Sequence, residues 1–236
     1  SMVLMERAAL KVAEKAEEIL KKKEAGTRKK GTVWAVCGLG NNGADGVAAA
    51  RMLFLHGFHV SVILPGTEGK KSAEMEAQLA IAAKLKIPVF TAEDFIPGSC
   101  DLIIDAVFGI GLSRDVEGPY GALVDLIGMQ KETAVVSVDI PSGINSDTGA
   151  VMGCAVQADV TVTFGEKKLG QALFPGREAC GELIVADIGF VPEEREKAEG
   201  HALCHTREDL KSIPQRMPYS HKGTYGKILV IAGSPG

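Results

Sequence analysis

The glycine-rich segment Gly38–Gly46, with the sequence GLGNNGADG, has the residue types and spacing of a ligand-binding turn. It follows an apolar run at 32–37, and Gly38, Gly40 and Gly43 have the spacing G-x-G-x-x-G. Such a turn attracts phosphate because its backbone N–H groups point at the anion and no side chain blocks the approach. The same residues are also typical of a plain tight turn, so the spacing alone leaves both interpretations open.

Three side chains in this segment add oxygen ligands: Asn41, Asn42 and Asp45. Oxygen-only ligation suits a hard cation. A hydride-transferring dinucleotide domain also needs an acidic residue at the end of the second strand, where it binds the ribose. The expected second strand ends instead in Leu64–Gly66. The segment therefore predicts phosphate or cation binding, and it disfavours an NAD-dependent dehydrogenase.

Two aspartates lie at the ends of buried apolar runs. Asp105 lies near the end of the run 101–107, and Asp139 directly follows the run 134–138. In open α/β sheets, ligands bind at the carboxyl ends of the strands. A carboxylate in such a place is costly unless it is paired or used in chemistry. Each aspartate could instead cap the turn that follows it, so the pattern makes both of them candidate site residues.

Two further groups follow expected strands. The loop Gly109–Asp115 contains two glycines, a hydroxyl, a cation and a carboxylate, and Asp115 could equally be a surface charge. Lys168 follows an expected strand at 158–164. On sequence alone an exposed basic pair is the favoured interpretation for this lysine, although its side chain could also reach into the same site.

The expected elements alternate between helix and strand. Apolar residues recur with a helical period over 3–24, and short apolar runs are typical of buried strands. This order predicts a parallel sheet with helices on both faces. The expected helices cover 3–24, 47–56, 72–85 and 119–129, and the expected strands cover 32–37, 59–64, 87–90, 101–107, 134–138, 158–164 and 182–188.

Composition excludes several classes of protein. Hydrophobic residues make up 46% of the chain, which excludes a disordered chain. The net charge of −4 argues against a general nucleic-acid-binding surface. No apolar run approaches the roughly 20 residues of a membrane span. Five scattered cysteines without a C-x-x-C pair indicate a reducing, cytoplasmic compartment.

The C-terminal part has a different composition. Residues 191–220 are charged and contain three prolines, which predicts a linker after a domain at 3–190. Residues 221–236 then show a new glycine-rich turn and an apolar run. A single β unit cannot bury its own faces, so this segment is interpreted as the first strand of a second, truncated domain.

Several motifs in this order resemble the YjeF N-terminal family, the NAD(P)H-hydrate epimerases. The resemblance covers roughly residues 3–190 and rests on LMERAA, CGLGNNGADG, DAVFGIGLSRDVEGPY, SVDIPSGINSDTG, ADVTVTF and VADIGF. It implies a Rossmann-like three-layer α/β/α sandwich with a mostly parallel sheet. The tail 221–234 resembles the opening of the dehydratase domain that follows in bifunctional members, so dehydratase activity should be absent from this chain.

The resemblance implies that the enzyme interconverts the R and S epimers of hydrated NADH or NADPH in nicotinamide nucleotide repair. It also implies a potassium ion held by Asn42, Asp105 and Ser142. The implied substrate contacts are Asn41, Asn42, Gly43, Ala44, Asp45, Gly109, Ile110, Gly111, Leu112, Ser113, Arg114, Asp115 and Asp139.

The chain departs from the family pattern at two positions of the glycine-rich segment. Leu39 stands where the family has proline, and Ala44 stands where it has glycine. The methyl group of Ala44 is compatible with the turn only if this residue has a negative φ.

Epimerisation breaks and remakes a bond at the hydrated carbon, and a carboxylate can move the proton. Asp139 is the first candidate and Asp115 the second, with Lys168 assisting through its charge. The alternative function is a non-catalytic nucleotide-binding or scaffold module of the same fold. We expect a homodimer or a larger homo-oligomer, a small-molecule substrate, and no nucleic-acid or membrane partner.

Overall fold

The computed structural model describes residues 2–24, 30–66 and 69–190 and, further along, residues 202, 208–213, 217–221, 223–227 and 229. The chain divides into two units, Ser1–Lys197 and Ala198–Gly236. In the second unit the described element is a short 3₁₀ helix, Asp209–Ser212, whose residues are exposed. The strand expected within 221–236 falls largely outside the described residues, so the truncated second domain stays a prediction.

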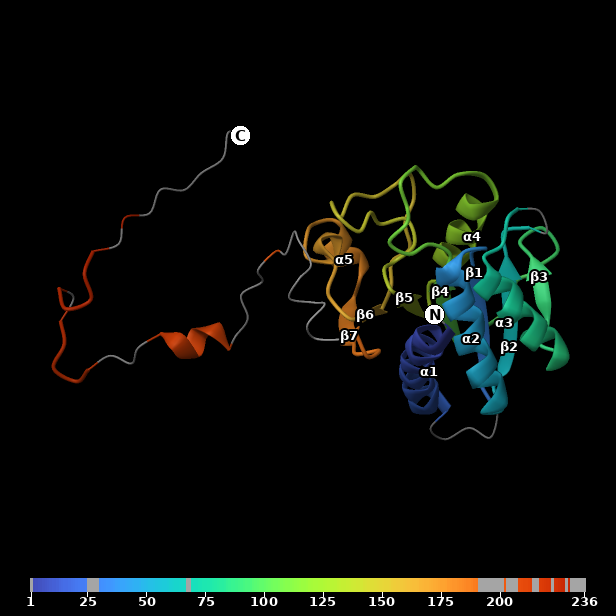
Figure 1. Cartoon of the computed structure of the whole chain (residues 1–236), viewed down its shortest axis with the longest axis horizontal. Helices are drawn as coiled ribbons and strands as arrows, with labels where there is room; N and C mark the ends of the chain where they lie inside the picture. The colour runs from blue at the N-terminus through green and yellow to red at the C-terminus, as the bar shows by residue number, and fades with distance from the viewer. Residues whose placement is uncertain are drawn as a thin grey trace. The chain divides into compact units, whose positions relative to one another are not determined.

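The first unit is a parallel sheet covered by helices (Figure 1). Its helices are α1 (Met2–Glu24), α2 (Asn41–Leu55), α3 (Ala73–Lys84), α4 (Gly118–Met129) and α5 (Gly176–Ala179). Its strands are β1 (Thr32–Cys37), β2 (His59–Leu64), β3 (Val89–Thr91), β4 (Leu102–Ala106), β5 (Ala134–Val138), β6 (Val160–Phe164) and β7 (Glu182–Ala186). The sheet order is β3-β2-β1-β4-β5-β6-β7, and every neighbouring pair is parallel.

Alternate residues of the central strands pack on opposite faces of the sheet. In β1, Val33, Ala35 and Cys37 belong to the core under α1, α2 and α3, whereas Trp34 and Val36 belong to the core under α4. Strand residues point alternately up and down, so a strand that is apolar throughout must be covered on both sides. The predicted three-layer α/β/α sandwich is therefore confirmed.

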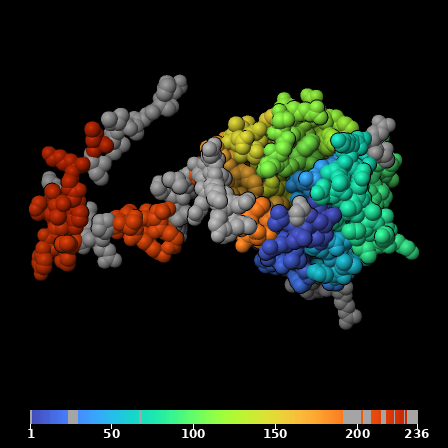
Figure 2. Space-filling view, viewed as in Figure 1, coloured from blue at the N-terminus to red at the C-terminus, as the bar shows by residue number. Residues whose placement is uncertain are grey.

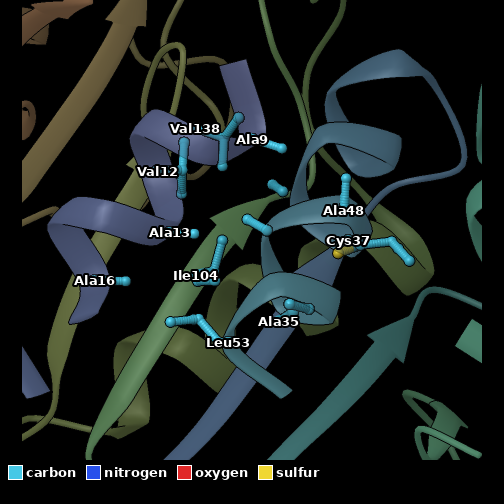
Figure 3. Close-up of a cluster of buried hydrophobic side chains, with 14 of the residues drawn as sticks. Ala9, Val12, Ala13, Ala16, Ala35, Cys37, Ala48, Leu53, Ile104 and Val138 are labelled. Atoms are coloured by element: carbon cyan, nitrogen blue, oxygen red, sulfur yellow. The ribbon is translucent and has the colours of Figure 1, made fainter. Parts of the chain in front are cut away.

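Small side chains let α1 and α2 pack closely on the sheet (Figure 3). Ala9, Ala13 and Ala16 of α1 and Ala48 of α2 are buried, and they belong to the same core cluster as Ile104 of β4. In the space-filling view, the dark-blue atoms of α1 adjoin the lighter-blue atoms of α2 on the face shown (Figure 2). No helix in the described ranges is long and apolar enough to cross a bilayer.

Helix α2 begins six residues earlier than the sequence predicts, at Asn41 instead of Val47. Asparagine and glycine favour turns over helices, and this preference produced the late predicted start. The Ala44 N–H donates to the Gly40 carbonyl at 3.1 Å, which closes the first helical turn. Ala44 is helical and has no positive φ, so its methyl group is compatible with the backbone.

The order of the strands places a crevice between β1 and β4. Helix α2, which follows β1, covers one face of the sheet, and α4, which follows β4, covers the other. The two connections therefore leave β1 and β4 in opposite directions. At such a switch point the carboxyl edge of the sheet is open to a ligand.

Candidate active site

A cavity of about 500 Å³ lies at this switch point. It is enclosed by the start of α2, the loop after β4 and the turn after β5. Its lining residues are Leu39, Gly40, Asn41, Asn42, Asp45, Val107, Phe108, Gly109, Ile110, Gly111, Leu112, Tyr120 and Asp139. The glycine-rich segment, the loop after Asp105 and Asp139 thus lie around one space, although they are far apart in the sequence.

The N-terminal end of α2 forms one wall of the cavity. Gly40 is the N-cap, and as a glycine it has no side chain that could cap the first N–H groups of the helix. The first backbone N–H groups of a helix have no partner within the helix, and the helix dipole favours an anion there. This wall is therefore suited to a phosphate group.

Two glycines allow this geometry. A Cβ at Gly43 would lie 1.9 Å from the Gly38 carbonyl oxygen, and a Cβ at Gly38 would lie 2.1 Å from the Val107 carbonyl oxygen. Both distances are far below van der Waals contact, so α2 can pass this close to the strand ends only with glycine. Gly43 and Ala44 are buried and support the wall from behind; they do not line the cavity.

The backbone of Asp139 is held in an unusual conformation. Its φ is +67°, in the left-handed region that aspartate tolerates better than most residues. The Asp139 N–H donates to the Val162 carbonyl at 2.8 Å, and the Asp139 carbonyl accepts from Gln171 Nε2 at 2.6 Å. Strained backbone of this kind persists only where the surrounding contacts offset its energetic cost, and it is concentrated at functional sites.

The Asp139 carboxylate is paired with Lys168. Lys168 Nζ lies 2.5 Å from Asp139 Oδ1 and also donates to Thr163 Oγ1 at 2.8 Å and to the Phe164 carbonyl at 3.2 Å. The Thr163 hydroxyl donates to the same carboxylate oxygen at 3.1 Å. Asp139 is only 8% exposed, so the ion pair is largely shielded from water. Lys168 is thus paired with a residue that lines the cavity and is mostly buried, unlike the exposed basic pair that sequence alone favoured.

Asp45 is the second carboxyl group that lines the cavity. It is half-buried on α2. Burial, reinforced by the negative charge of Asp139, raises the pKa of Asp45 from its ordinary value of 3.8 to about 7. Asp45 and Asp139 therefore differ in environment, because Asp139 has a lysine partner and Asp45 has none among the described residues.

We expect Asp45→Asn to stabilise the fold at alkaline pH. Because the pKa of Asp45 is higher in the folded chain than in the unfolded chain, folding takes up a proton between about pH 4 and pH 7. The stability that this group contributes is present at low pH and is lost as the pH rises through 7. Urea unfolding should show the variant roughly 1–2 kcal/mol more stable than the parent at pH 8 and equal to it near pH 4. An equal difference in the free energy of unfolding between variant and parent at both pH values would contradict the raised pKa of Asp45.

Asp105 is fully buried and has neutral partners. It accepts hydrogen bonds from Ser137 Oγ at 2.7 Å, from Ser142 Oγ at 2.5 Å and from the Ser142 N–H at 2.9 Å. Burial raises the pKa of Asp105, and these hydrogen bonds oppose the rise. No cation is within ion-pair distance of Asp105 in the described part of the chain.

The Asn42 side chain lies beside this group. A Cβ at Gly109 would be 3.0 Å from Asn42 Oδ1, and the preceding Phe108 N–H donates to Ser142 Oγ at 2.9 Å. Asn42 Nδ2 is buried and has no hydrogen-bond partner among the described residues. Turning the amide over would put its oxygen at this unpartnered position. A buried carboxylate, a hydroxyl and an amide form an all-oxygen donor set that fits a hard cation.

This donor set does not fit a transition metal. Within the ranges that the structure describes, no group of three or more His, Cys, Asp or Glu side chains is placed to hold a metal ion. Potassium binding by Asn42, Asp105 and Ser142 is compatible with the geometry and stays a prediction.

The second half of the loop after β4 lies beside a neighbouring hollow. Arg114 and Asp115 line this hollow of about 400 Å³, which shares Phe108, Leu112 and Tyr120 with the main cavity. Ser113, Arg114 and Asp115 are exposed. Of the expected contacts in this loop, Gly109–Leu112 thus line the cavity that holds Asp139, and the remaining three lie outside it.

Two residues of this region were not predicted as site residues. Tyr120 lines the cavity, and its ring lies 4.9 Å from that of Phe108, centroid to centroid. Gln171 is fully buried, and its side chain joins the Asp139 carbonyl to the Lys168 N–H, which donates to Gln171 Oε1 at 2.9 Å. Tyr120 is the last residue of the motif DAVFGIGLSRDVEGPY, and this position could have marked it as a candidate site residue. Nothing in the sequence around Gln171 marks it.

The fold and the cavity place the chain in the class of doubly wound α/β domains with a ligand site at the switch point. Its residues 1–170 match the model of the family described as YjeF-related protein N-terminus. The chain belongs to this family, as its motifs predict.

Curated relatives of two lengths are similar to the chain. It is 43% identical to an NAD(P)H-hydrate epimerase of Limosilactobacillus fermentum, over 79% of this chain and 86% of the relative. It is 40% identical to a bifunctional NAD(P)H-hydrate repair enzyme Nnr of Thermofilum pendens, over 98% of this chain and 44% of the relative. The chain thus spans less than half the length of this bifunctional relative.

A solved structure shows the same fold. The crystal structure of yeast ynu0 (YNL200c) superposes with a TM-score of 0.67 at 23% identity and covers 86% of each chain. This likeness confirms the architecture at a sequence identity too low to carry function.

Proposed function

We propose that this chain is an NAD(P)H-hydrate epimerase, which interconverts the R and S epimers of hydrated NADH or NADPH. The observation that carries the proposal is the Asp139–Lys168 pair beside a cavity that the N-terminal end of α2 also lines. This arrangement offers a proton-transfer group and a phosphate-binding wall in one space. The names of the relatives support the same reaction.

In this proposal the N-terminal end of α2 binds the pyrophosphate, and the hydrated ring lies near Asp139. Phe108 and Tyr120 supply aromatic surface for the ring or the base. Epimerisation requires the configuration at the hydrated carbon, next to the ring nitrogen, to be inverted. Asp139 then moves the proton, and Lys168 holds its carboxylate in place. Asp115, exposed beside the neighbouring hollow, is the second candidate for proton transfer.

A purified chain provides a direct test. Incubation with either pure epimer of NADHX should yield the same final mixture of R and S forms much faster than the spontaneous interconversion. Chromatographic separation of the two epimers measures this. A rate equal to that of the solution without protein would contradict the proposal and would favour the alternative, a nucleotide-binding or scaffold module.

We also propose that a potassium ion is held by Asn42, Asp105 and Ser142. The fully buried Asp105 and the unpartnered amide of Asn42 support this assignment. When bound, the ion supplies positive charge that orders the loops around the cavity. Asp105 and Ser142 hold the loop after β4 to the turn after β5, because Ser142 bonds both Asp105 and Phe108.

We expect potassium to stabilise the folded chain. An ion that binds only the native state adds stability that grows with its concentration, here ~1–3 kcal/mol at a potassium concentration ten- to a hundredfold above its dissociation constant. The melting temperature of the parent should therefore be higher in potassium chloride than in choline chloride at equal ionic strength. The Asp105→Asn variant should show no difference between the two salts. Equal melting of the parent in both salts would refute the potassium site.

The C-terminal residues support a proposal about the longer protein. The match to the bifunctional relative covers 98% of this chain and so extends into the second unit. We infer that residues 221–236 begin a dehydratase domain in a longer polypeptide. The epimerase product would then be the substrate of the domain that follows.

A further inference from the structure

The cavity is lined by two carboxyl groups from different elements, Asp45 of α2 and Asp139 of the turn after β5. We propose that Asp45 is the general acid of the epimerisation and that Asp139 is its base. This inference rests on the proposed function and assigns a role to a residue that the family resemblance implies only as a substrate contact.

The partners of the two groups differ. Asp139 accepts hydrogen bonds from Lys168 Nζ and Thr163 Oγ1, so its carboxyl group has a cation and a hydroxyl as partners. No hydrogen bond or ion pair joins the Asp45 carboxyl to any other side chain in the described part of the chain. A carboxyl group that lacks such partners and is half withdrawn from water favours its neutral form, which can donate a proton.

The lining of the cavity gives Asp45 no positive partner. Among the described residues that line the cavity, the other ionisable groups are Asp139 and Tyr120, and none is a cation. Burial and the charge of Asp139 raise the pKa of Asp45 to about 7, against a smaller opposing effect of the positive charge of the N-terminal amine. Two carboxyl groups held in different environments are a common arrangement of an acid and a base in one site.

The proposed step is balanced as follows. The Asp45 carboxylic acid gives its proton to the hydroxyl oxygen on the hydrated carbon. The C–O bond breaks, its electron pair stays with the oxygen, and water leaves. The lone pair of the ring nitrogen forms a C=N bond, which makes the carbon planar and the ring cationic.

Water then adds to the other face of this carbon, and the electron pair of the C=N bond returns to the ring nitrogen. The adding water gives one proton to the Asp139 carboxylate. The turnover leaves Asp45 charged and Asp139 neutral, so one proton has crossed the cavity. Exchange with solvent, or turnover in the opposite direction, restores the starting state.

The test compares three chains: the parent, the variant Asp45→Asn and the control Asp125→Asn. Asp125 is an exposed aspartate on α4 that lies outside the cavity. Each chain is given R-NADHX in potassium buffer from pH 5.5 to 9. We expect Asp45→Asn to lower kcat at neutral pH by roughly 100-fold or more, with KM within a few-fold of the parent. The kcat of the parent should fall above about pH 7 as Asp45 loses its proton, and the variant should lack this alkaline decline.

A second readout follows the oxygen. In water enriched in heavy oxygen, each inversion by the parent should place one solvent oxygen in the product, as measured by mass spectrometry against a sample without protein. A parent that interconverts the epimers without this incorporation would overturn the dehydration step.

The outcomes separate this inference from the proposed function. A parent chain that leaves R-NADHX unchanged would overturn both. The role of Asp45 alone would be overturned if the parent is active and the Asp45→Asn variant is equally active. It would also be overturned if the variant differs from the parent only by a higher KM. A melting temperature of Asp45→Asn at or above that of the parent excludes misfolding as the cause of a low rate.

Discussion

Asp139→Asn should lose epimerase activity by roughly 10²–10⁴-fold in kcat while the chain stays folded. Asparagine has nearly the same shape and also tolerates the positive φ found at this position. The amide can still accept a hydrogen bond from Lys168, but it cannot take up a proton. The loss should therefore appear in kcat, with a much smaller change in KM.

The matched control for this substitution is Asp125→Asn, which removes one exposed aspartate from α4 and should leave kcat unchanged. Thermal unfolding of both variants checks the fold. Burial is the main cause of the raised pKa of Asp45, and the charge of Asp139 adds to it; the substitution removes this charge, so the pKa of Asp45 should fall but stay above its ordinary value. A kcat for Asp139→Asn within a few-fold of the parent would remove Asp139 from proton transfer and leave Asp115 as the candidate.

Gly43→Ala should both destabilise the fold and disable the site. The added Cβ would lie 1.9 Å from the Gly38 carbonyl oxygen and 2.7 Å from the Gly38 carbonyl carbon. Both atoms are backbone, so the N-terminal end of α2 must move. We expect a loss of about 3 kcal/mol in the free energy of unfolding. A displacement of about 1 Å in this wall of the cavity should also lower kcat/KM by roughly 100-fold.

Gly40→Ala is the matched control for stability, because it adds the same methyl group to the same glycine-rich segment. Gly40 has φ −90°, and no heavy atom lies within 4 Å of its Cβ position. Because Gly40 is the N-cap of α2 and alanine is a poorer N-cap than glycine, its free energy of unfolding should fall by only about 1 kcal/mol. Chemical denaturation measures both variants, and equal stability of Gly43→Ala and Gly40→Ala would show that the close approach of α2 to Gly38 is not tight.

The fold was predictable because its signals are local and agree with one another. Apolar runs such as 32–37 and 134–138 match β1 and β5 at both ends. Strands that are apolar on both sides must be buried between layers of helices, which gives the sandwich. The start of α2 was not predictable in this way, because its first turn consists of asparagine and glycine residues that favour turns. Its helical form depends on packing against the strand ends.

The site was predictable where chemistry and position coincide in the sequence. Asp139 and the glycine-rich segment follow strands, and the structure brings both to one cavity. Lys168 could not be assigned from residues alone, because an exposed lysine and a paired lysine have the same local pattern. Gln171 was missed because its partner, the carbonyl of Asp139, lies 32 residues away. Contacts of this kind arise only when the chain is folded.

The most direct test of the central claim is the repair of R-NADHX in a coupled assay. A dehydratase that consumes only the S epimer is supplied with R-NADHX in potassium buffer, and the recovery of NADH is followed with and without this chain. The epimerase proposed here predicts that the chain greatly accelerates the recovery. Recovery at the spontaneous rate, with the chain folded and potassium present, would contradict it.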